Sequence, residues 1–240
     1  MTPEKMTPRQ VRDIEYVLLP GTDRKTTDIV IERNGVITVR PPADYSPEMV
    51  DAVVESKRMW IYRNLAEWKD LNASVVAREW VNGETFLYLG RAYRLALVSD
   101  QKCDLLLKEG RFCLDRALIE KNGINAAELA FETYFTDKGE ERFKERVAYF
   151  APKVGVNITG IKVKDMGFRW ASCGVNGVLN FHWKCMMAPP KIIDYIVVHE
   201  LCHLHHANHT DAFWNEVDKV MPDYRERKEW LKKYGASLVI

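Results

Sequence analysis

A chain of 240 residues is long enough to bury the core of one large domain or two small ones, so folding alone requires neither disulfides nor a structural metal. Its 35 basic and 34 acidic residues nearly cancel, which gives no support for a nucleic-acid partner, although it does not exclude one. The five cysteines form no C-x-x-C pair and no apolar run is long enough for a membrane span, so we expect a cytoplasmic protein with reduced thiols.

The first half of the chain predicts mainly antiparallel strands and one helix. Two alternating runs flank Asn34-Gly35 and predict a β-hairpin over residues 28–40. Ser46-Pro47-Glu48 then supplies an N-cap, a proline at the first helical position and an acid in the first turn of one long amphipathic helix. Further strands are predicted in "FLYLGRAYRLALV" and "RFCLDRALI".

The residue pattern changes near Asn122-Gly123, which predicts a boundary between two regions. The segment that follows is long, charged and helical, unlike the strands before it. We therefore expect a β-rich region with one helix over residues 1–122 and a second region over 123–240, packed together as one unit. Within the second region, three strands are predicted between residues 157 and 187, the last two joined through Asn176-Gly177.

The last of these strands, residues 178–186, alternates in polarity and leads to a helix. Its polar side chains, Asn180, His182 and Lys184, are expected on a wet face. Two prolines, at 189 and 190, can start but not continue a helix, and the apolar residues after them recur at helical spacing. The pattern predicts a partly buried helix, a break at Ala207-Asn208, and a second helix capped by Thr210-Asp211.

Five of the six histidines lie near the end of the first of these helices, and two of them form the pattern H-E-x-x-H. His199 and His203 are four residues apart, so their imidazoles lie on one helical face and can bind one ion. In this pattern zinc takes both histidines, while the glutamate, here Glu200, stays off the metal as general base. Structural zinc is the alternative, but such sites are usually closed by four ligands and rich in cysteine, and the nearby Cys202 is poorly aimed.

A catalytic zinc ion needs a third protein ligand, for which three histidines compete. His205 points away from the metal and is expected at the surface. His206 has the right direction but lies too far along the helix, so it is expected behind the ligands or at the surface. A chain turn at Ala207-Asn208 can bring His209 back under the metal; the alternative is a later acid, Glu216 or Asp223.

The residues around this motif resemble a known family. The stretches "HWKCMMAPPKIIDYIVVHELCHLHHANHTDAFW", "RWASC" and "MPDYRERKEWL" resemble the YgjP-like zinc metallopeptidase domain, which is related to the SprT-like proteases, and "VITVRPP" and "YLGRAYRL" extend the likeness over nearly the whole chain. The resemblance implies a zincin-type domain with His199, His203 and His209 as ligands and Glu200 as base. The chain departs from the family pattern at Ala171, where glycine is usual, and at His182, where asparagine is common.

We therefore expect an α+β protein with a zincin-like catalytic domain, an antiparallel sheet plus an active-site helix, preceded by a hairpin-rich region. The expected activity is hydrolysis of a peptide or protein substrate by a zinc-activated water with Glu200 as base. His182, Arg169 and Tyr224 are candidates for lining the cleft or stabilising the oxyanion, and by analogy with zinc peptidases the strand at 178–186 is the candidate docking edge.

Two other functions compete with this prediction. The same centre could hydrolyse a non-peptide substrate such as a nucleotide phosphoanhydride, since fold and zinc do not determine the bond attacked. The sequence shows no glycine loop for phosphate, which disfavours this alternative. A non-catalytic interaction module held together by zinc is the third possibility, and an intact Glu200 argues against it.

Overall fold

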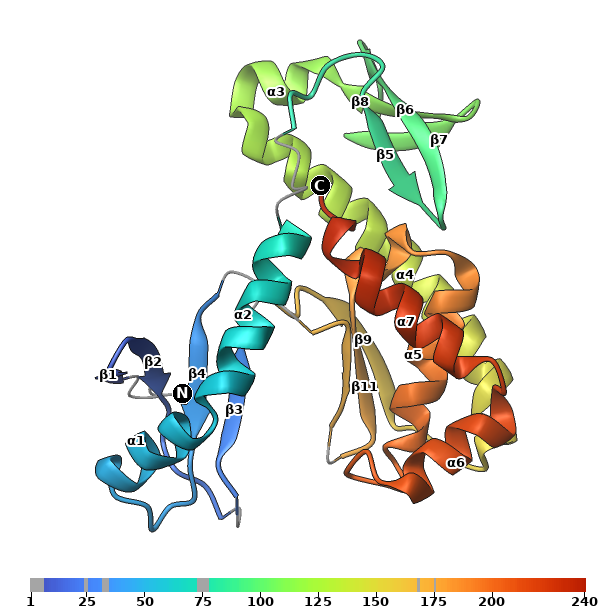
Figure 1. The fold of residues 1–240 in the computed structure, drawn as a ribbon. Coiled ribbons are helices and arrows are strands. Elements are labelled where there is room, and N and C mark those ends of the chain that lie inside the picture. Colours follow the sequence, from blue (N-terminus) through green and yellow to red (C-terminus); the bar gives the residue numbers. More distant parts are fainter. Residues whose placement is uncertain (1–6, 24–25, 32–34, 73–77, 168, 175) are drawn as a thin grey trace. The chain divides into compact units, whose positions relative to one another are not determined.

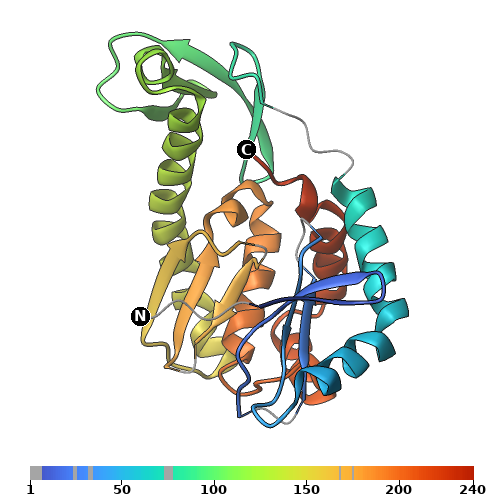
Figure 2. The same ribbon diagram turned by 90° about the vertical axis from the view of Figure 1, so that its left-hand side faces the viewer.

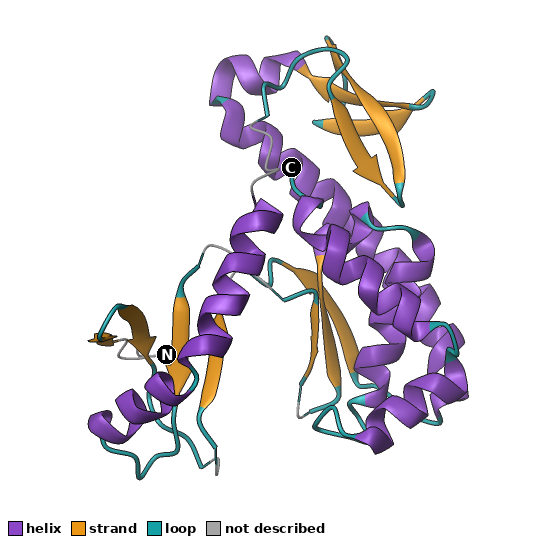
Figure 3. Ribbon diagram, in the orientation of Figure 1, coloured by secondary structure: helices purple, strands orange, loops and turns teal. Residues whose placement is uncertain are grey.

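The computed structural model describes residues 7–23, 26–31, 35–72, 78–167, 169–174 and 176–240. The chain divides into two compact units, Met1–Val75 and Val76–Ile240. Each unit combines helices and strands (Figure 1, Figure 3), so the expected α+β class is confirmed.

The first unit contains a four-stranded sheet in the order β1-β2-β4-β3. Its strands are β1 (Thr7–Val11), β2 (Ile14–Leu18), β3 (Asp28–Ile31) and β4 (Ile37–Arg40). β3 and β4 pair antiparallel from Asp28 opposite Arg40 to Ile31 opposite Ile37, which confirms the hairpin predicted at 28–40. The tip of that hairpin, including Asn34, lies outside the described residues.

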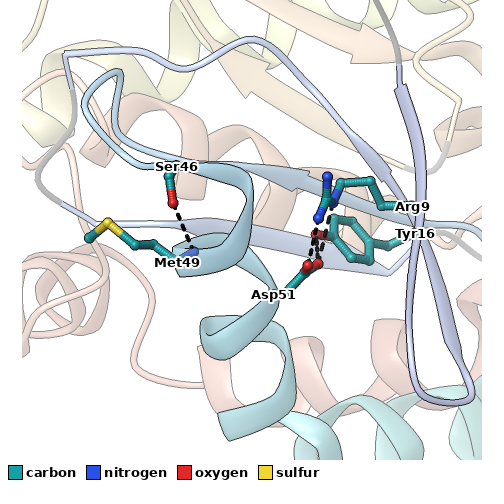
Figure 4. A network of polar contacts seen from close by, with 5 residues as sticks. All are labelled: Arg9, Tyr16, Ser46, Met49 and Asp51. Carbon is teal, nitrogen blue, oxygen red and sulfur yellow. Dashed lines mark hydrogen bonds and ion pairs between the residues drawn. The ribbon is translucent and has the colours of Figure 1, made fainter.

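Two helices of the first unit replace the single long helix that the sequence predicts. α1 (Pro47–Ser56) begins as expected, with the Ser46 hydroxyl accepting a hydrogen bond from the Met49 amide at 3.4 Å (Figure 4). It ends at Ser56, because the backbone of Lys57 leaves helical geometry at φ −97°, and α2 (Arg58–Asn72) follows. No proline or glycine marks this break, so the residue pattern could not reveal it.

A charged network attaches α1 to the sheet. Asp51 on α1 binds the Arg9 guanidinium at 2.6 Å and accepts a hydrogen bond from the Tyr16 hydroxyl at 2.6 Å (Figure 4). Beneath it, Val50 and Val54 of α1 join Ile14, Tyr16, Ile37, Val39 and Ile61 in a small core that belongs to this unit alone.

The second unit begins with a sheet in the order β5-β6-β8-β7. Its strands are β5 (Thr85–Tyr88), β6 (Arg91–Val98), β7 (Leu105–Lys108) and β8 (Arg111–Asp115). The predicted strand in "RFCLDRALI" stops at Asp115, because the Asp115 carboxylate caps α3 (Arg116–Asn122) by accepting from the Ala117 amide at 3.0 Å. The long α4 (Ile124–Val154) comes next.

The sheet and α4 share one core. Phe86 of β5 stacks on Phe131 of α4 with ring centroids 4.5 Å apart, and Phe112 of β8 lies 5.0 Å from the same ring. The expected boundary near Asn122-Gly123 therefore does not separate two compact units, because the strands before it and the helix after it are packed together.

A second, three-stranded sheet lies along α4 in the order β10-β11-β9 (Figure 2). Its strands are β9 (Gly160–Lys164), β10 (Ala171–Cys173) and β11 (Val178–His182), so the three predicted strands are present. β11 pairs antiparallel with β10 and parallel with β9, which makes this sheet mixed where an antiparallel one was expected.

The last strand is shorter than predicted. β11 ends at His182, and Trp183–Met187 forms a 3-10 helix, η1. The alternation fails because Trp183, Cys185, Met186 and Met187 are all buried in the core, so both sides of the segment are covered.

Three helices complete the unit where two were expected: α5 (Pro190–Cys202), α6 (Asp211–Val220) and α7 (Tyr224–Tyr234), followed by a short 3-10 turn, η2 (Gly235–Ser237). The additional break follows from Pro222, which cannot continue α6. α5 is the central element, in contact with α4, α6, α7 and β10. An ion pair between Arg146 of α4 and Asp194 of α5, 2.6 Å long, joins the two helices.

Candidate metal centre

The last turn of α5 presents two imidazoles side by side. His199 lies within the helix, and His203 is its C-cap residue with a backbone that is still helical (φ −66°, ψ −18°). Helical spacing therefore places both rings on one face. Their Nε2 atoms are 3.2 Å apart.

A tight turn after α5 returns the chain to this pair. α5 ends five residues before the predicted break at Ala207-Asn208, and the amides of His205 and His206 both bond back to the Cys202 carbonyl. The returning chain places the Nε2 of His209 at 2.9 Å from the Nε2 of His199. The ligand atoms of His199, His203 and His209 all lie within 4.8 Å of one another, and no other group of three metal-type ligands occurs among the described residues.

These three nitrogens fit a single divalent ion. Tetrahedral zinc with bonds of about 2.0–2.1 Å would separate its nitrogen donors by roughly 3.4 Å, slightly more than the spacings to His199. Burial lowers the pKa of His199 to about 3, helped by His203, His209 and the charge of Lys228. Burial, His203 and the charge of Lys228 also lower the pKa of His209. Both rings are therefore neutral at pH 7, the form that binds metals.

Aromatic packing holds the three rings in place. Phe213 of α6 lies 5.0, 4.7 and 4.8 Å from the rings of His199, His203 and His209. Trp214, the next residue, stacks on His209 at 5.5 Å. Because His209 precedes the first residue of α6, helical spacing does not link it to Phe213, and the sequence carried no signal for this contact.

Glu200 lies beside His199 on α5 with only 6% of its surface exposed. Burial raises the pKa of its carboxyl group to about 8, while the charge of Arg169 and a hydrogen bond from the Cys173 backbone amide oppose the shift. Its Oε2 has no partner among the described residues. Burying a carboxylate oxygen without a hydrogen-bond partner lowers the stability of the fold. Such an atom therefore marks a place where a group outside the protein chain is expected.

The other residues named from the sequence have different surroundings. Arg169 is exposed and close enough for its charge to act on Glu200. Tyr224, at the start of α7, is buried and stacks at 5.3 Å on Trp214, the residue that stacks on His209.

His182 is buried, which contradicts its expected place on a wet face. Its Nε2 lies 3.2 Å from the Gly167 carbonyl, and its Nδ1 accepts a hydrogen bond from the Lys184 amide. Both ring nitrogens therefore bind backbone atoms near the end of β11.

The docking edge predicted at residues 178–186 is also wrong. β11 is the central strand of its sheet, so neighbours occupy both of its edges. Among the described strands, β10 forms the free edge of this sheet on the side of α5. The backbone groups that point towards β11 belong to Ser172 and to the two residues that flank β10, Trp170 and Gly174. The Trp170 carbonyl accepts a hydrogen bond from the His182 amide, and the Gly174 amide donates to the Val178 carbonyl. Ala171 and Cys173 therefore direct their backbone groups away from β11, and the Cys173 amide donates to the Glu200 carboxylate.

The acids proposed as alternative third ligands are used elsewhere. Glu216 binds the rings of His205 and His206, each at 2.5 Å. Asp223 pairs with Arg227 at 2.9 Å. Neither belongs to the group formed by the three histidines.

Comparison with known proteins places the chain among the metallopeptidases. The family model described as "YgjP-like, metallopeptidase domain" matches residues 25–234, and the chain therefore belongs to the YgjP-like family. The metallopeptidase class implies a metal ion, for which the three histidines form a suitable group. Within the described residues, no helix has the length and apolar character that a membrane span requires.

No curated protein matches the chain. Among solved structures, the crystal structure of the metallopeptidase zymogen of Pyrococcus abyssi abylysin is 20% identical, with a TM-score of 0.34, over 36% of this chain and 89% of that chain. A likeness of this extent carries no argument about the site.

Proposed function

We propose that the chain is a zinc-dependent peptidase in which His199, His203 and His209 hold the metal and Glu200 is the general base. The observation that supports this most directly is the convergence of three imidazoles next to a buried carboxylate, one oxygen of which has no partner among the described residues. Zinc bound there would supply Lewis-acid polarisation of the substrate carbonyl and lower the pKa of water.

Glu200 has the properties of a proton carrier. A pKa near the working pH allows a carboxylate to take a proton from the attacking water and return it to the leaving amine. Burial supplies this shift, and the Cys173 amide keeps one side of the carboxylate oriented. A module that used zinc only to hold its fold would have no reason to bury such a group, because its desolvation costs stability.

Substrate docks, in this proposal, along the free edge of β10. The outward backbone groups of Ala171 can pair with an extended peptide, as strands do when they add to a sheet edge. Arg169, which precedes this strand and acts on Glu200, is the better placed candidate for stabilising the carbonyl oxygen; Tyr224 and His182 are buried. Family membership favours peptide bonds over phosphoanhydrides.

The test is Glu200→Gln in the zinc-loaded protein, with hydrolysis of a fluorogenic unfolded protein as readout. Glutamine keeps the size of the side chain but cannot carry the proton, so turnover should fall by roughly 10²–10⁴-fold while zinc content is retained and the melting temperature does not fall. Glu229→Gln, an exposed change of the same kind on α7, should leave turnover unchanged. Parental activity in Glu200→Gln would exclude this residue as the base.

A further inference from the structure

The turn between the second and third histidines of the centre is held by a residue from the following helix. Glu216 of α6 binds the His205 ring through Oε1 and the His206 ring through Oε2, both at 2.5 Å. Its side chain is only 17% exposed, against 41% for His205 and 30% for His206. One partly buried carboxylate thus spans two successive residues of the turn.

The same turn orients His203. The Nδ1–H of His203 donates to the His206 backbone carbonyl at 2.9 Å. A proton on Nδ1 leaves the lone pair on Nε2, which is the nitrogen that faces His199. In contrast, the Nδ1 of His199 is buried without a partner among the described residues. His203 is therefore the ligand whose tautomer depends on a carbonyl of the turn.

α6 is a firm support for Glu216. Phe213 and Val217, on either side of Glu216 in sequence, are fully buried, and Phe213 touches all three histidine rings. The helix begins at Asp211, two residues after His209. Through Glu216, the helix that follows the third histidine also holds the turn that orients the second.

We propose that Glu216 is a positioning residue of the metal centre: by holding the rings of His205 and His206 it fixes the His206 carbonyl, which keeps His203 in the tautomer and orientation that present Nε2. This inference rests on the proposed metal-binding role of the three histidines. Groups that orient metal-binding histidines typically change metal affinity 10–100-fold when removed. An ordinary surface ion pair would leave metal affinity unchanged.

The experiment compares Glu216→Gln with the parent in the full-length chain. Zinc affinity is measured by competition with a chromogenic chelator, and the melting temperature is measured without metal. We expect zinc affinity to fall about 10-fold with little change in the metal-free melting temperature. Asp218→Asn is the matched control, because it removes one charge from the same helix at an exposed pair with Arg225 and should leave zinc affinity unchanged.

Two further variants show whether Glu216 acts through the turn. His206→Ala retains the backbone carbonyl but loses the ring that Glu216 holds, so Glu216→Gln should weaken zinc binding less in this background than in the parent. His209→Ala removes a proposed ligand and should lose far more affinity than either change.

Three outcomes would overturn the inference: parental zinc affinity in Glu216→Gln, an equal loss in Asp218→Asn, or a metal-free melting temperature that falls enough to account for the loss. If the parent binds no zinc, or if His209→Ala binds it normally, the proposed metal centre itself is wrong. These results distinguish the two proposals without a measurement of hydrolysis.

Discussion

His199 and Glu200 are neighbours in sequence, and burial moves their pKa values in opposite directions. The pKa of His199 falls to about 3 and that of Glu200 rises to about 8. Each shift favours the neutral form, as expected when burial removes water from a charged group and its remaining partners do not compensate. The metal-free centre therefore destabilises the fold at pH values where these groups are charged in the unfolded chain.

The stability of the metal-free protein should depend on pH through Glu200. Its folded pKa lies above the ordinary 4.5, so the folded state binds more protons between pH 4.5 and 8. The associated stability is fully present below pH 4.5, is lost as pH rises and is gone above pH 8. At about 1.4 kcal/mol per pKa unit, the loss is up to about 5 kcal/mol.

Comparison with Glu200→Gln isolates this effect. The contribution of His199 is present above pH 6.5 and lost as pH falls towards 3, and it cancels because both proteins contain it. Urea unfolding from pH 4.5 to 9 should show the variant gaining stability on the parent up to pH 8 and no further. A difference that does not vary with pH would show that Glu200 titrates normally.

At the scale of elements, a hairpin turn supports the start of α5. The amides of Leu89 and Gly90, between β5 and β6, donate to the carbonyls of Met186 and Met187 in η1 at 2.8 and 3.1 Å. Both turn residues have positive φ, 49° and 75°, which favours glycine at the second position. A Cβ on Gly90 would lie 2.9 Å from the Cα of Pro189, immediately before α5.

Gly90→Ala should consequently destabilise the protein more than the same change at Gly110. Gly110 occupies the equivalent position between β7 and β8, with φ 73°, but a Cβ there would meet nothing within 4 Å. Backbone strain alone should cost about 1 kcal/mol in Gly110→Ala, and the clash with Pro189 should add roughly 1–3 kcal/mol in Gly90→Ala. Urea unfolding of the two variants measures the difference in their free energies of unfolding. Equal losses of this free energy would mean that the turn at Gly90 accommodates the added methyl group without additional strain.

At the scale of the whole molecule, each unit has a core of its own. The buried cluster of the first unit extends from Ile14 to Ile61, and that of the second from Trp80 to Leu238, without a shared residue. Every residue of the candidate centre lies in the second unit. A domain with its own core can in principle fold alone.

We therefore expect the fragment Val76–Ile240 to fold and to bind zinc with the affinity of the full chain. Cooperative thermal unfolding and the chelator competition test this expectation. His209→Ala in the fragment is the control, because it should abolish zinc binding without unfolding the core. A fragment that is unfolded without residues 1–75 would show that the first unit is required for the second.

Several features could be predicted from the sequence because neighbouring residues encode them. Four-residue spacing places His199 and His203 on one helical face, alternation around a turn predicts the hairpin at 28–40, and Ser46-Pro47 marks the start of α1. These patterns follow from the periods of helix and strand, which depend only on backbone geometry. The same local patterns carried the family resemblance, which the match over residues 25–234 confirms.

Tertiary structure decided the features that depend on residues far apart in sequence. Alternation in residues 178–186 predicts a two-faced strand, but the pairing of β11 on both edges and the burial of His182 come from β9, β10 and the core. Spacing limits the third ligand to a few candidates, whereas the turn after Cys202 brings His209 to His199 and α6 directs Glu216 to His205 and His206. Sequence periodicity specifies which face a side chain occupies, and only packing specifies what that face meets.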